Sequence, residues 1–291
     1  MTASPQIILA KSAGYCFGVQ RAVDTVLEQV REHGRERTIY TLGSLIHNQQ
    51  VIEDLAEKGV VTLPDEGSLD EIGDGIVIIR SHGVSHAVME MLDSKGIRYV
   101  DATCPFVERI HKIVREEEQA GHRVIVVGNP DHPEVKGICG WCEQQPTVIR
   151  STREAEEFSD AEERLISVVV QTTFQKTNFE EIVEILRHKG YNVNVLDTIC
   201  SATLERQKEA AEIASKVDVM LVVGDAHSSN TQKLFEICNT CCSNTYYVQV
   251  PDDLDLDQVM SVRTVGITAG ASTPNYIIEE VQNHVRRKDF V

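Results

Sequence analysis

Short runs of β-branched and other apolar residues recur along this chain, and longer amphipathic stretches separate them. Segments 179–189 and 204–216 have the amphipathic pattern of helices. Short continuous apolar runs with helices between them are typical of buried parallel strands in β–α units. The sequence therefore predicts an α/β fold whose strands include residues 76–79, 124–127, 168–170, 219–223 and 265–267.

Small polar residues follow each of these apolar runs. Open parallel sheets bind ligands just beyond the carboxyl ends of their strands, so these segments are the candidate site. They are rich in His, Ser, Thr and Asn, and they occupy residues 80–83, 128–134, 171–173, 224–230 and 268–274.

A weak internal repeat surrounds three of the eight cysteines. Segments 101–104 and 197–200 share the pattern D-x-x-C, each after a short strand and before a helix, and Cys16 has the same layout without the Asp. Units of similar length, each with one cysteine at a helix start, indicate three α/β lobes around one centre. We expect these lobes, each with a mostly parallel sheet, at residues 1–101, 102–198 and 199–291, the last with a C-terminal tail.

The position of these cysteines suggests metal binding. At a helix N-terminus the helix dipole stabilises a thiolate, which is the form that binds metal. Thiolates of Cys16, Cys104 and Cys200 would hold three corners of a cubane iron–sulfur cluster and leave one iron open as a Lewis acid or redox site. Cubane sites usually have four cysteine ligands at short spacings. The alternative is that the three are buried small apolar residues, a common environment for free cysteine.

Three histidines lie near glycines in the expected β–α turns, at His47, His82 and His132. Imidazoles beside backbone N–H groups at helix N-termini suit a phosphate group. Two further strand ends add the polar residues Ser228, Ser229, Asn230 and Ser272. The alternative for any one histidine is a loop or core side chain with a single hydrogen bond.

Glu134 and Thr172 are candidates for proton transfer. Glu134 lies two residues after His132, in a turn constrained by Pro130 and Pro133. A carboxyl group in a water-poor cleft has a raised pKa and can donate a proton. The alternative is a solvated surface carboxylate, and Thr172 has the same ambiguity.

Composition limits the partners. The chain carries 28 Lys and Arg against 45 Asp and Glu, a formal net charge of -17. Such a surface repels nucleic acid and anionic lipid. The first residues lack the features of an export signal, and no stretch approaches the ~20 apolar residues that cross a bilayer. We therefore expect a cytoplasmic protein with reduced cysteines, without nucleic acid or membrane as a partner.

The remaining cysteines form two C-x-x-C pairs, which include Cys139 with Cys142 and Cys238 with Cys241, followed by Cys242. The pairs are much further apart than the ~15–20 residues usual in a zinc ribbon. We expect buried packing for the first pair and helix-end positions for the second.

Seven short motifs are spread along the chain and carry a resemblance to a known family that extends from about Ile7 to Glu280. They are Ala13-Gly14-Tyr15-Cys16-Phe17-Gly18-Val19, Ile79-Arg80-Ser81-His82-Gly83, Asp101-Ala102-Thr103-Cys104-Pro105, His132-Pro133-Glu134-Val135, Gln171-Thr172-Thr173, Ser228-Ser229-Asn230 and Thr268-Ala269-Gly270-Ala271-Ser272. In this order they resemble the motifs of the LytB/IspH family of 4-hydroxy-3-methylbut-2-enyl diphosphate reductases.

The resemblance implies a cloverleaf of three lobes around an oxygen-sensitive 4Fe-4S cluster. Its ligands would be Cys16, Cys104 and Cys200, one from each lobe, with one open iron. Glu134 and Thr172 would contact the substrate hydroxyl and relay protons. The diphosphate would be bound by His47, His82, His132, Ser228, Ser229, Asn230 and Ser272.

The reaction implied by the resemblance is a two-electron reductive loss of the allylic hydroxyl, which gives isopentenyl and dimethylallyl diphosphates. It is the last step of the methylerythritol phosphate route to isoprenoids. A ferredoxin or flavodoxin would supply electrons one at a time, and a basic docking patch for it could include the arginines that follow the cysteines, Arg21, Arg109 and Arg206. One departure from many relatives is His227, where asparagine is expected.

Two other functions compete with this one. An iron–sulfur hydro-lyase also uses a cubane with one open iron but needs no electron donor. A zinc-stabilised protein that binds a phosphorylated metabolite would use the C-x-x-C pairs and would be colourless.

Overall fold

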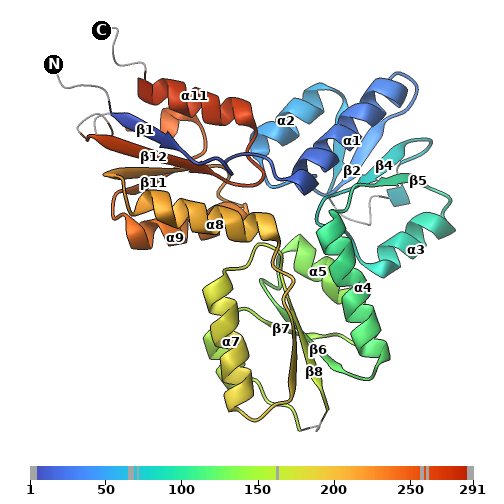
Figure 1. Cartoon of the computed structure of the whole chain (residues 1–291). Coiled ribbons are helices and arrows are strands. Elements are labelled where there is room, and N and C mark those ends of the chain that lie inside the picture. The colour runs from blue at the N-terminus through green and yellow to red at the C-terminus, as the bar shows by residue number, and fades with distance from the viewer. Residues whose placement is uncertain are drawn as a thin grey trace. The chain divides into compact units, whose positions relative to one another are not determined.

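The computed structural model of the chain describes residues 5–64, 69–70, 72–161, 164–255, 259 and 262–286. These residues form three parallel sheets of four strands each, with helices packed against the sheets (Figure 1). The α/β class with three parallel-sheet lobes is therefore confirmed. The chain divides into two compact units, one with Val19 and the residues before it, His47–Val51 and the residues from Ser201 onward, the other with Gln20–Ile46 and Ile52–Cys200.

The first unit contains one sheet. Its strands, in spatial order, are β1 (Gln6–Leu9), β12 (Thr264–Ala269), β10 (Val219–Val223) and β11 (Thr245–Val248). Its helices are α8 (Ser201–Ala214), α9 (Ser229–Cys241) and α11 (Asn275–Arg286), and η2 (Pro251–Asp253) is a short 3₁₀ turn.

Alternation along β10 explains how these helices pack, because successive side chains of a strand point to opposite faces. Leu221 packs with residues of α11, whereas Met220 and Val222 pack with residues of α8 and α9. Both faces of the sheet are therefore covered, which is why β10 is apolar throughout.

The second unit contains two sheets. One has the strands β3 (Val60–Leu63), β2 (Ile39–Leu42), β4 (Ile76–Ile79) and β5 (Arg98–Asp101), in that order. Three helices lie along this part of the chain, α1 (Phe17–His33), α2 (Gln49–Glu57) and α3 (His86–Ser94). Val88 and Leu92 of α3 pack with Val77 and Ile79 of β4.

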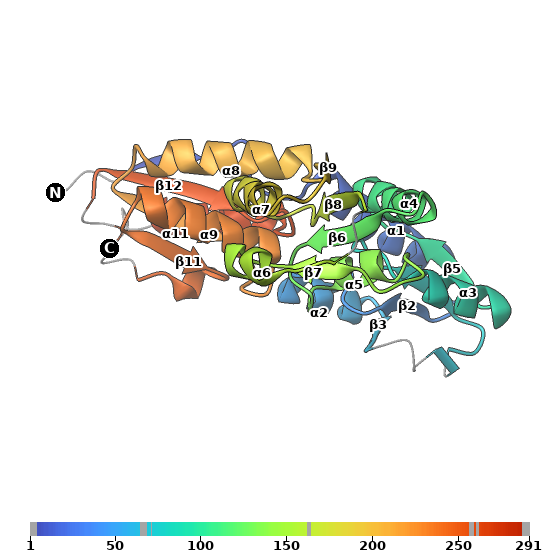
Figure 2. The same cartoon turned by 90° about the horizontal axis from the view of Figure 1, so that it is seen from below.

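The other sheet of this unit has the strands β7 (Thr147–Ile149), β6 (Arg123–Val127), β8 (Ile166–Val170) and β9 (Val193–Leu196), in that order. Its helices are α4 (Pro105–Gln119), α5 (Pro133–Cys139), α6 (Thr152–Glu157) and α7 (Lys176–His188). Helices α4 and α5 cover one face, and α6 and α7 lie on the other (Figures 1 and 2).

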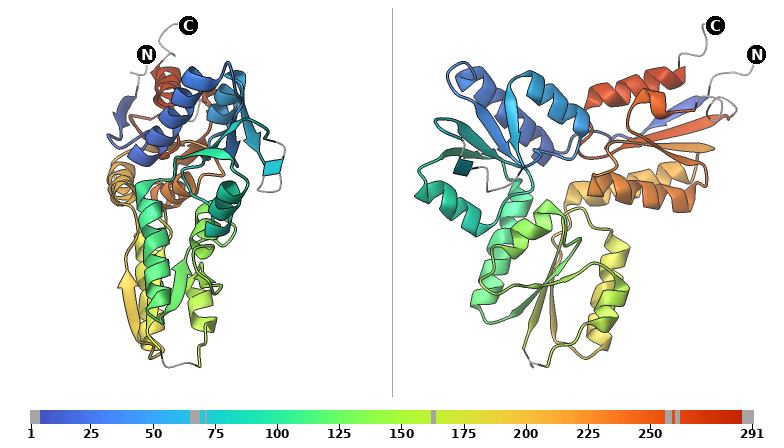
Figure 3. Two further views of the ribbon diagram at one scale, coloured as in Figure 1. Left: turned by 90° about the vertical axis from the view of Figure 1, so that its right-hand side faces the viewer. Right: turned by 180° about the vertical axis from the view of Figure 1, so that it is seen from behind.

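The three sheets share one topology. In each, an edge strand (β1, β5 or β9) pairs with a second strand (β12, β4 or β8), which pairs with a third (β10, β2 or β6). The ribbon of each lobe shows the same alternation of strand and helix (Figure 3). Equivalent loops therefore follow equivalent strands in all three lobes.

Strand β1 differs from the expected lobe at residues 1–101. It pairs with β12 from Gln6↔Thr264 to Leu9↔Ile267, so it completes the sheet formed by the last part of the chain. The other expected boundaries stay a prediction, and the C-terminal tail lies outside the described residues. Among the helices described here, none has the length and apolar character needed to span a bilayer.

Candidate functional site

Three cysteines occupy equivalent places in the three sheets. Cys16, Cys104 and Cys200 each come after an edge strand and directly before a helix, and each is partly exposed. Their backbone N–H groups donate to carbonyl oxygens of the loop after the neighbouring strand, on Ala271 (3.2 Å), Ser81 (3.0 Å) and Thr172 (3.0 Å) respectively. Each acceptor lies two residues beyond the end of its strand. The repeat in the sequence is therefore a repeat in the structure.

The aspartates of the D-x-x-C segments shape the two turns that contain them. Asp101 Oδ1 accepts from the N–H of Thr103 at 2.8 Å, and Asp197 Oδ1 accepts from the N–H of Ile199 at 3.2 Å. These side chains close turns between the strand and the helix. Cys104 is then the N-cap of α4, with Pro105 as its first helical residue.

The other five cysteines have different environments. Cys139, Cys238 and Cys242 are buried, and burial raises the pKa of the Cys139 thiol to about 11 and that of Cys238 to about 12. Burial also raises the pKa of Cys142 to about 12, although this residue is partly exposed. Cys241 is the exposed last residue of α9, and Cys242 is its C-cap, which confirms the helix-end positions. The raised pKa values of Cys139, Cys142 and Cys238 make their thiolates, the form that binds metal, harder to form than that of an ordinary cysteine.

Glu134 carries a buried carboxyl group. Its side chain is buried in α5, where its Oε1 accepts from the N–H of Thr172 at 2.6 Å and its Oε2 accepts from the Thr172 hydroxyl at 2.7 Å. Burial raises the pKa of Glu134, and the two hydrogen bonds from Thr172 oppose that effect only in part. A proton on this carboxyl group is therefore retained to higher pH than on an exposed glutamate.

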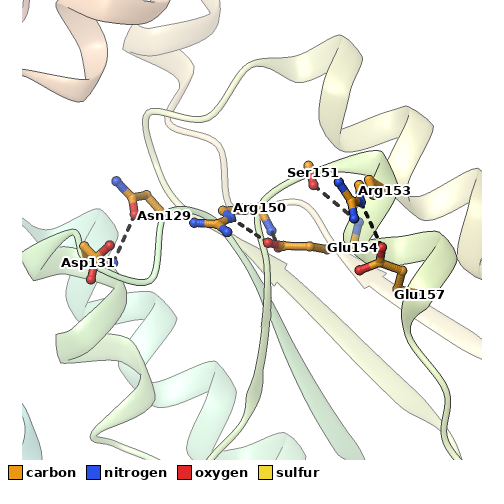
Figure 4. A network of polar contacts seen from close by, with 7 residues as sticks. All are labelled: Asn129, Asp131, Arg150, Ser151, Arg153, Glu154 and Glu157. Atoms are coloured by element: carbon orange, nitrogen blue, oxygen red, sulfur yellow. Dashed lines mark hydrogen bonds and ion pairs between the residues drawn. The ribbon is translucent and has the colours of Figure 1, made fainter.

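His132 caps the helix that carries Glu134. Its Nδ1 accepts from the N–H of Glu134 at 3.1 Å, so the neutral ring carries its hydrogen on Nε2. The preceding loop is held by Asn129 Oδ1, which accepts from the N–H of Asp131 at 3.0 Å (Figure 4). The other contacts in Figure 4 lie along α6, from Arg150 and the N-cap Ser151 just before it to its last residue, Glu157.

His82 lies in the loop after β4, and its ring contacts that of His132. The two centroids are 5.2 Å apart and the planes are at 87°. The next residue, Gly83, has φ of +71°, and a Cβ there would lie 2.7 Å from Cε1 of His111. His111 is buried and stacked on Trp141, and burial lowers its pKa to about 4. A neutral ring therefore packs against the turn that carries His82.

Hydroxyl and amide groups gather at the strand ends of the first unit. Ser228 is the N-cap of α9, and its Oγ lies 3.3 Å from the Oγ of Ser272. The Ser272 hydroxyl donates to the carbonyl of His47 at 2.9 Å. Asn230 is buried, and within the described residues its Nδ2 has no hydrogen-bond partner. Ser229 begins α9 and is partly exposed.

Asp225 was not expected from the sequence as part of this region. Its Oδ2 accepts from the N–H of Gln49 at 3.0 Å and its Oδ1 accepts from the N–H of His227 at 2.7 Å. The carboxylate thus joins the loop of His47 to the loop of Ser228. The only signal in the sequence is an acidic residue inside a polar strand-end segment. The side chain of His227 is exposed.

One of the three arginines expected in the basic docking patch is not on the surface, so that part of the prediction is wrong. Arg206 is only 3% exposed, because its guanidinium donates to backbone carbonyls inside the first unit. Arg21 is half-buried for the same reason in the second unit, and only Arg109 is exposed.

Three equivalent parallel lobes with thiols, imidazoles, hydroxyls and a buried carboxyl group beyond their strands define an α/β enzyme with a repeated architecture. Residues 7–286 match the family model described as LytB protein. The chain belongs to the LytB family, which is iron–sulfur dependent. This confirms the resemblance of the sequence motifs.

Curated relatives in this family are reductases. The chain is 44% identical over 282 residues to the 4-hydroxy-3-methylbut-2-enyl diphosphate reductase of Thermoanaerobacter sp. (strain X514), an alignment that covers 97% of this chain and 96% of the relative. It is 41% identical over 275 residues to the enzyme of the same name from Clostridioides difficile (strain 630), covering 94% of this chain and 97% of the relative.

Two solved structures are similar to this chain. The E-1-hydroxy-2-methyl-but-2-enyl-4-diphosphate reductase from Plasmodium falciparum superimposes with a TM-score of 0.92 at 27% identity, covering 99% of this chain and 90% of that one. A (E)-4-hydroxy-3-methyl-but-2-enyl diphosphate reductase, described as the terminal enzyme of the non-mevalonate pathway, superimposes with a TM-score of 0.71 at 37% identity, covering 97% and 99%.

Proposed function

We propose that this chain reduces 4-hydroxy-3-methylbut-2-enyl diphosphate to isopentenyl and dimethylallyl diphosphates, as its relatives' names imply. The reaction replaces the allylic C–O bond by a C–H bond, consumes two electrons and two protons, and releases water. The observation that carries the proposal is the buried Glu134 carboxyl group, held through both oxygens by Thr172. This carboxyl group can donate a proton, and the relatives of the chain are reductases.

The residues fit a 4Fe-4S cluster held by Cys16, Cys104 and Cys200. All three are partly exposed and located directly before helices, where the dipole favours a thiolate. Cys139, Cys142 and Cys238 fit less well, because burial raises the pKa of each thiol. Such a cluster would pass electrons from the donor to the substrate and would offer a Lewis-acidic iron.

Glu134 supplies a proton to the departing hydroxyl group. Hydroxide is a poor leaving group, so the oxygen must gain a proton as the C–O bond breaks. The raised pKa lets Glu134 hold its proton to higher pH than an exposed glutamate does. Thr172, whose hydroxyl is 2.7 Å from Glu134 Oε2, can pass the proton on by accepting it from the carboxyl group while it donates its own.

The diphosphate is bound by imidazoles, hydroxyls, an amide and helix N-termini rather than by lysine or arginine. We assign His47, His82, His132, Ser228, Ser229, Asn230 and Ser272 to it. Two observations support this assignment. His132 keeps its hydrogen on Nε2, and the buried Nδ2 of Asn230 lacks a partner among the described residues. A buried donor of this kind costs stability unless a ligand satisfies it.

A ferredoxin or flavodoxin is the proposed electron donor. Ferredoxins are typically acidic, and this chain has a net charge of -17. Docking between two acidic proteins needs a local basic contact. Of the three arginines that follow the cysteines, only Arg109 is exposed and suits this role.

The test is turnover of the substrate by anaerobically reconstituted protein with an artificial one-electron reductant. We expect both products, and none without the reductant. Turnover that does not require the reductant would support the hydro-lyase. A colourless protein that contains zinc and no sulfide would support the metabolite-binding protein instead.

A further inference from the structure

Two of the arginines that follow the proposed ligand cysteines are turned inward. Arg206, in α8 six residues after Cys200, donates from Nη1 to the carbonyl of Ala269 at 2.8 Å and from Nη2 to the carbonyl of Gly14 at 2.9 Å. Gly14 lies two residues before Cys16. A guanidinium on the helix that follows Cys200 therefore holds the backbone just before Cys16.

Arg21 repeats this arrangement in the second unit. It lies in α1, five residues after Cys16, and donates from Nη1 to the carbonyl of Thr103 at 2.8 Å and from Nη2 to the carbonyl of Asp101 at 3.2 Å. Thr103 directly precedes Cys104. Asp101 is the last residue of β5, just as Ala269 is the last residue of β12.

In both cases one guanidinium donates to two backbone carbonyls. One carbonyl belongs to the last residue of a strand, and the other belongs to a residue one or two positions before a cysteine. The planar fork of arginine suits such a bridge, because it presents several N–H donors in fixed directions, whereas a lysine ammonium does not. Burial of the cation has a large cost unless the hydrogen bonds are kept. The backbone before Cys104 and Cys16 is therefore fixed in place.

The charge of each guanidinium has a second effect. Each guanidinium lies five or six residues along the chain from a proposed cluster ligand, Arg206 buried and Arg21 half-buried. A cluster held by three thiolates gains negative charge when it is reduced, and a fixed positive charge nearby favours the reduced form. Exposed Arg109 lies five residues after Cys104, as Arg21 lies five after Cys16. It makes no hydrogen bond to a carbonyl within the described residues and is a natural control.

We propose that Arg21 and Arg206 are positioning residues for the cluster, which fix the backbone before two of its cysteines and raise its reduction potential. This inference rests on the proposed function. It assigns to these arginines a structural and electrostatic role in place of the docking role expected for Arg206.

The experiment compares Arg21→Met, Arg206→Met, Arg21→Lys, Arg206→Lys and the control Arg109→Met, each reconstituted anaerobically. The measurements are the rate of iron release to a chelator and the midpoint potential of the cluster. We expect the Met variants to release iron at least about tenfold faster, the factor for one hydrogen bond to a charged group, and to have a lower potential. The Lys variants should keep the potential near that of the wild type but release iron faster, and Arg109→Met should match the wild type.

Circular dichroism of each loaded variant shows whether it is folded. If Arg206→Met does not fold, the iron release and midpoint potential of Arg21→Met, at the half-buried position, and of the two Lys variants test the inference. Folded variants at both positions with wild-type iron release and potential would overturn this inference while the proposed function stands. A wild-type protein that binds no iron after reconstitution would overturn both.

Discussion

Thr172 donates twice to the carboxyl group of Glu134, from its backbone N–H to Oε1 at 2.6 Å and from its hydroxyl to Oε2 at 2.7 Å. The pair connects the loop after β8 with the start of α5, so a residue of one β–α turn fixes the acid of another. The N–H of Cys200 donates to the carbonyl of the same Thr172 at 3.0 Å. The proposed proton donor and one proposed cluster ligand thus share a single backbone support.

Replacing Glu134 with Gln should lower turnover by ~10²–10⁴-fold, the usual contribution of a positioned acid. The amide keeps the size of the side chain but cannot deliver a proton, so the barrier rises by ~3–5 kcal/mol. Cluster content and substrate binding should be unchanged. Steady-state rates with an artificial reductant, normalised to iron content, measure the effect. Near-normal turnover would mean that the proton comes from another group, such as the diphosphate.

Replacing Thr172 with Val should move the pH dependence of turnover to higher pH. The Thr172 hydroxyl lowers the pKa of Glu134, so its removal raises that pKa further. An acid works while protonated, and the rate falls as pH rises through its pKa. The valine variant, although slower at its optimum, should therefore keep its own maximal rate to a higher pH. The measurement is the pH profile of turnover for both proteins, and an identical or acid-shifted profile would contradict the proposed pairing.

The stability of the cluster-free protein should also depend on Glu134. Burial raises the pKa of Glu134 in the folded state above its ordinary value of 4.5, so the folded state binds more protons than the unfolded state between these two pKa values. This contribution to stability is complete below the unfolded pKa and is lost as pH rises through the folded pKa, with a slope of up to about 1.4 kcal/mol per pH unit. Urea unfolding at a series of pH values should show that Glu134→Gln lacks this fall. Parallel curves for the two proteins would contradict the raised pKa.

Replacing Cys16, Cys104 or Cys200 with Ser should abolish the visible absorption of the reconstituted cluster, because two thiolates do not hold a cubane that has an open iron. The matched controls are Cys139→Ser, at a buried site, and Cys241→Ser, at an exposed one. Both should keep their iron and sulfide in chemical analysis. Loss of iron from Cys139→Ser together with its retention in Cys104→Ser would show that the ligand assignment is wrong.

Replacing Asn230 with Leu should weaken the binding of inorganic diphosphate by ~10–100-fold, the range for one hydrogen bond to a charged group. Asn230→Asp should weaken it further, because a carboxylate would face the anion. Asn239, exposed on the same helix, provides the control Asn239→Leu. Calorimetric titration of the wild type and the three variants measures the four dissociation constants. Equal affinities for the wild type and Asn230→Leu would remove this amide from the site.

The strands could be predicted because their sequences are continuously apolar. The run 219–223 is β10 with the expected bounds, and 76–79 is β4. The expected helix at 179–189 is α7, which begins earlier, at Lys176. Helix ends depend on caps and side-chain contacts that periodicity does not reveal.

The positions of the cysteines could be predicted because D-x-x-C describes a local turn, which the bond from the Thr103 N–H to Asp101 confirms. The inward orientation of Arg206 could not, because its partners are the carbonyls of Gly14 and Ala269. Every residue has a carbonyl, so nothing in the sequence distinguishes these two. The bonds of Asp225 to backbone N–H groups were missed for the same reason.

The pairing of β1 with β12 has a consequence for how the protein is made. The two sheets of the second unit use contiguous stretches of chain, so they can form while synthesis continues, whereas β1 has no partner strand until β12 leaves the ribosome. At ~5–20 residues per second, that wait is on the order of ten seconds or more. The hydrogen bond from Cys16 to Ala271 forms only after this step. The thiol of Cys16 therefore reaches its final position later than those of Cys104 and Cys200, so the proposed cluster site is complete only after β12 has been made.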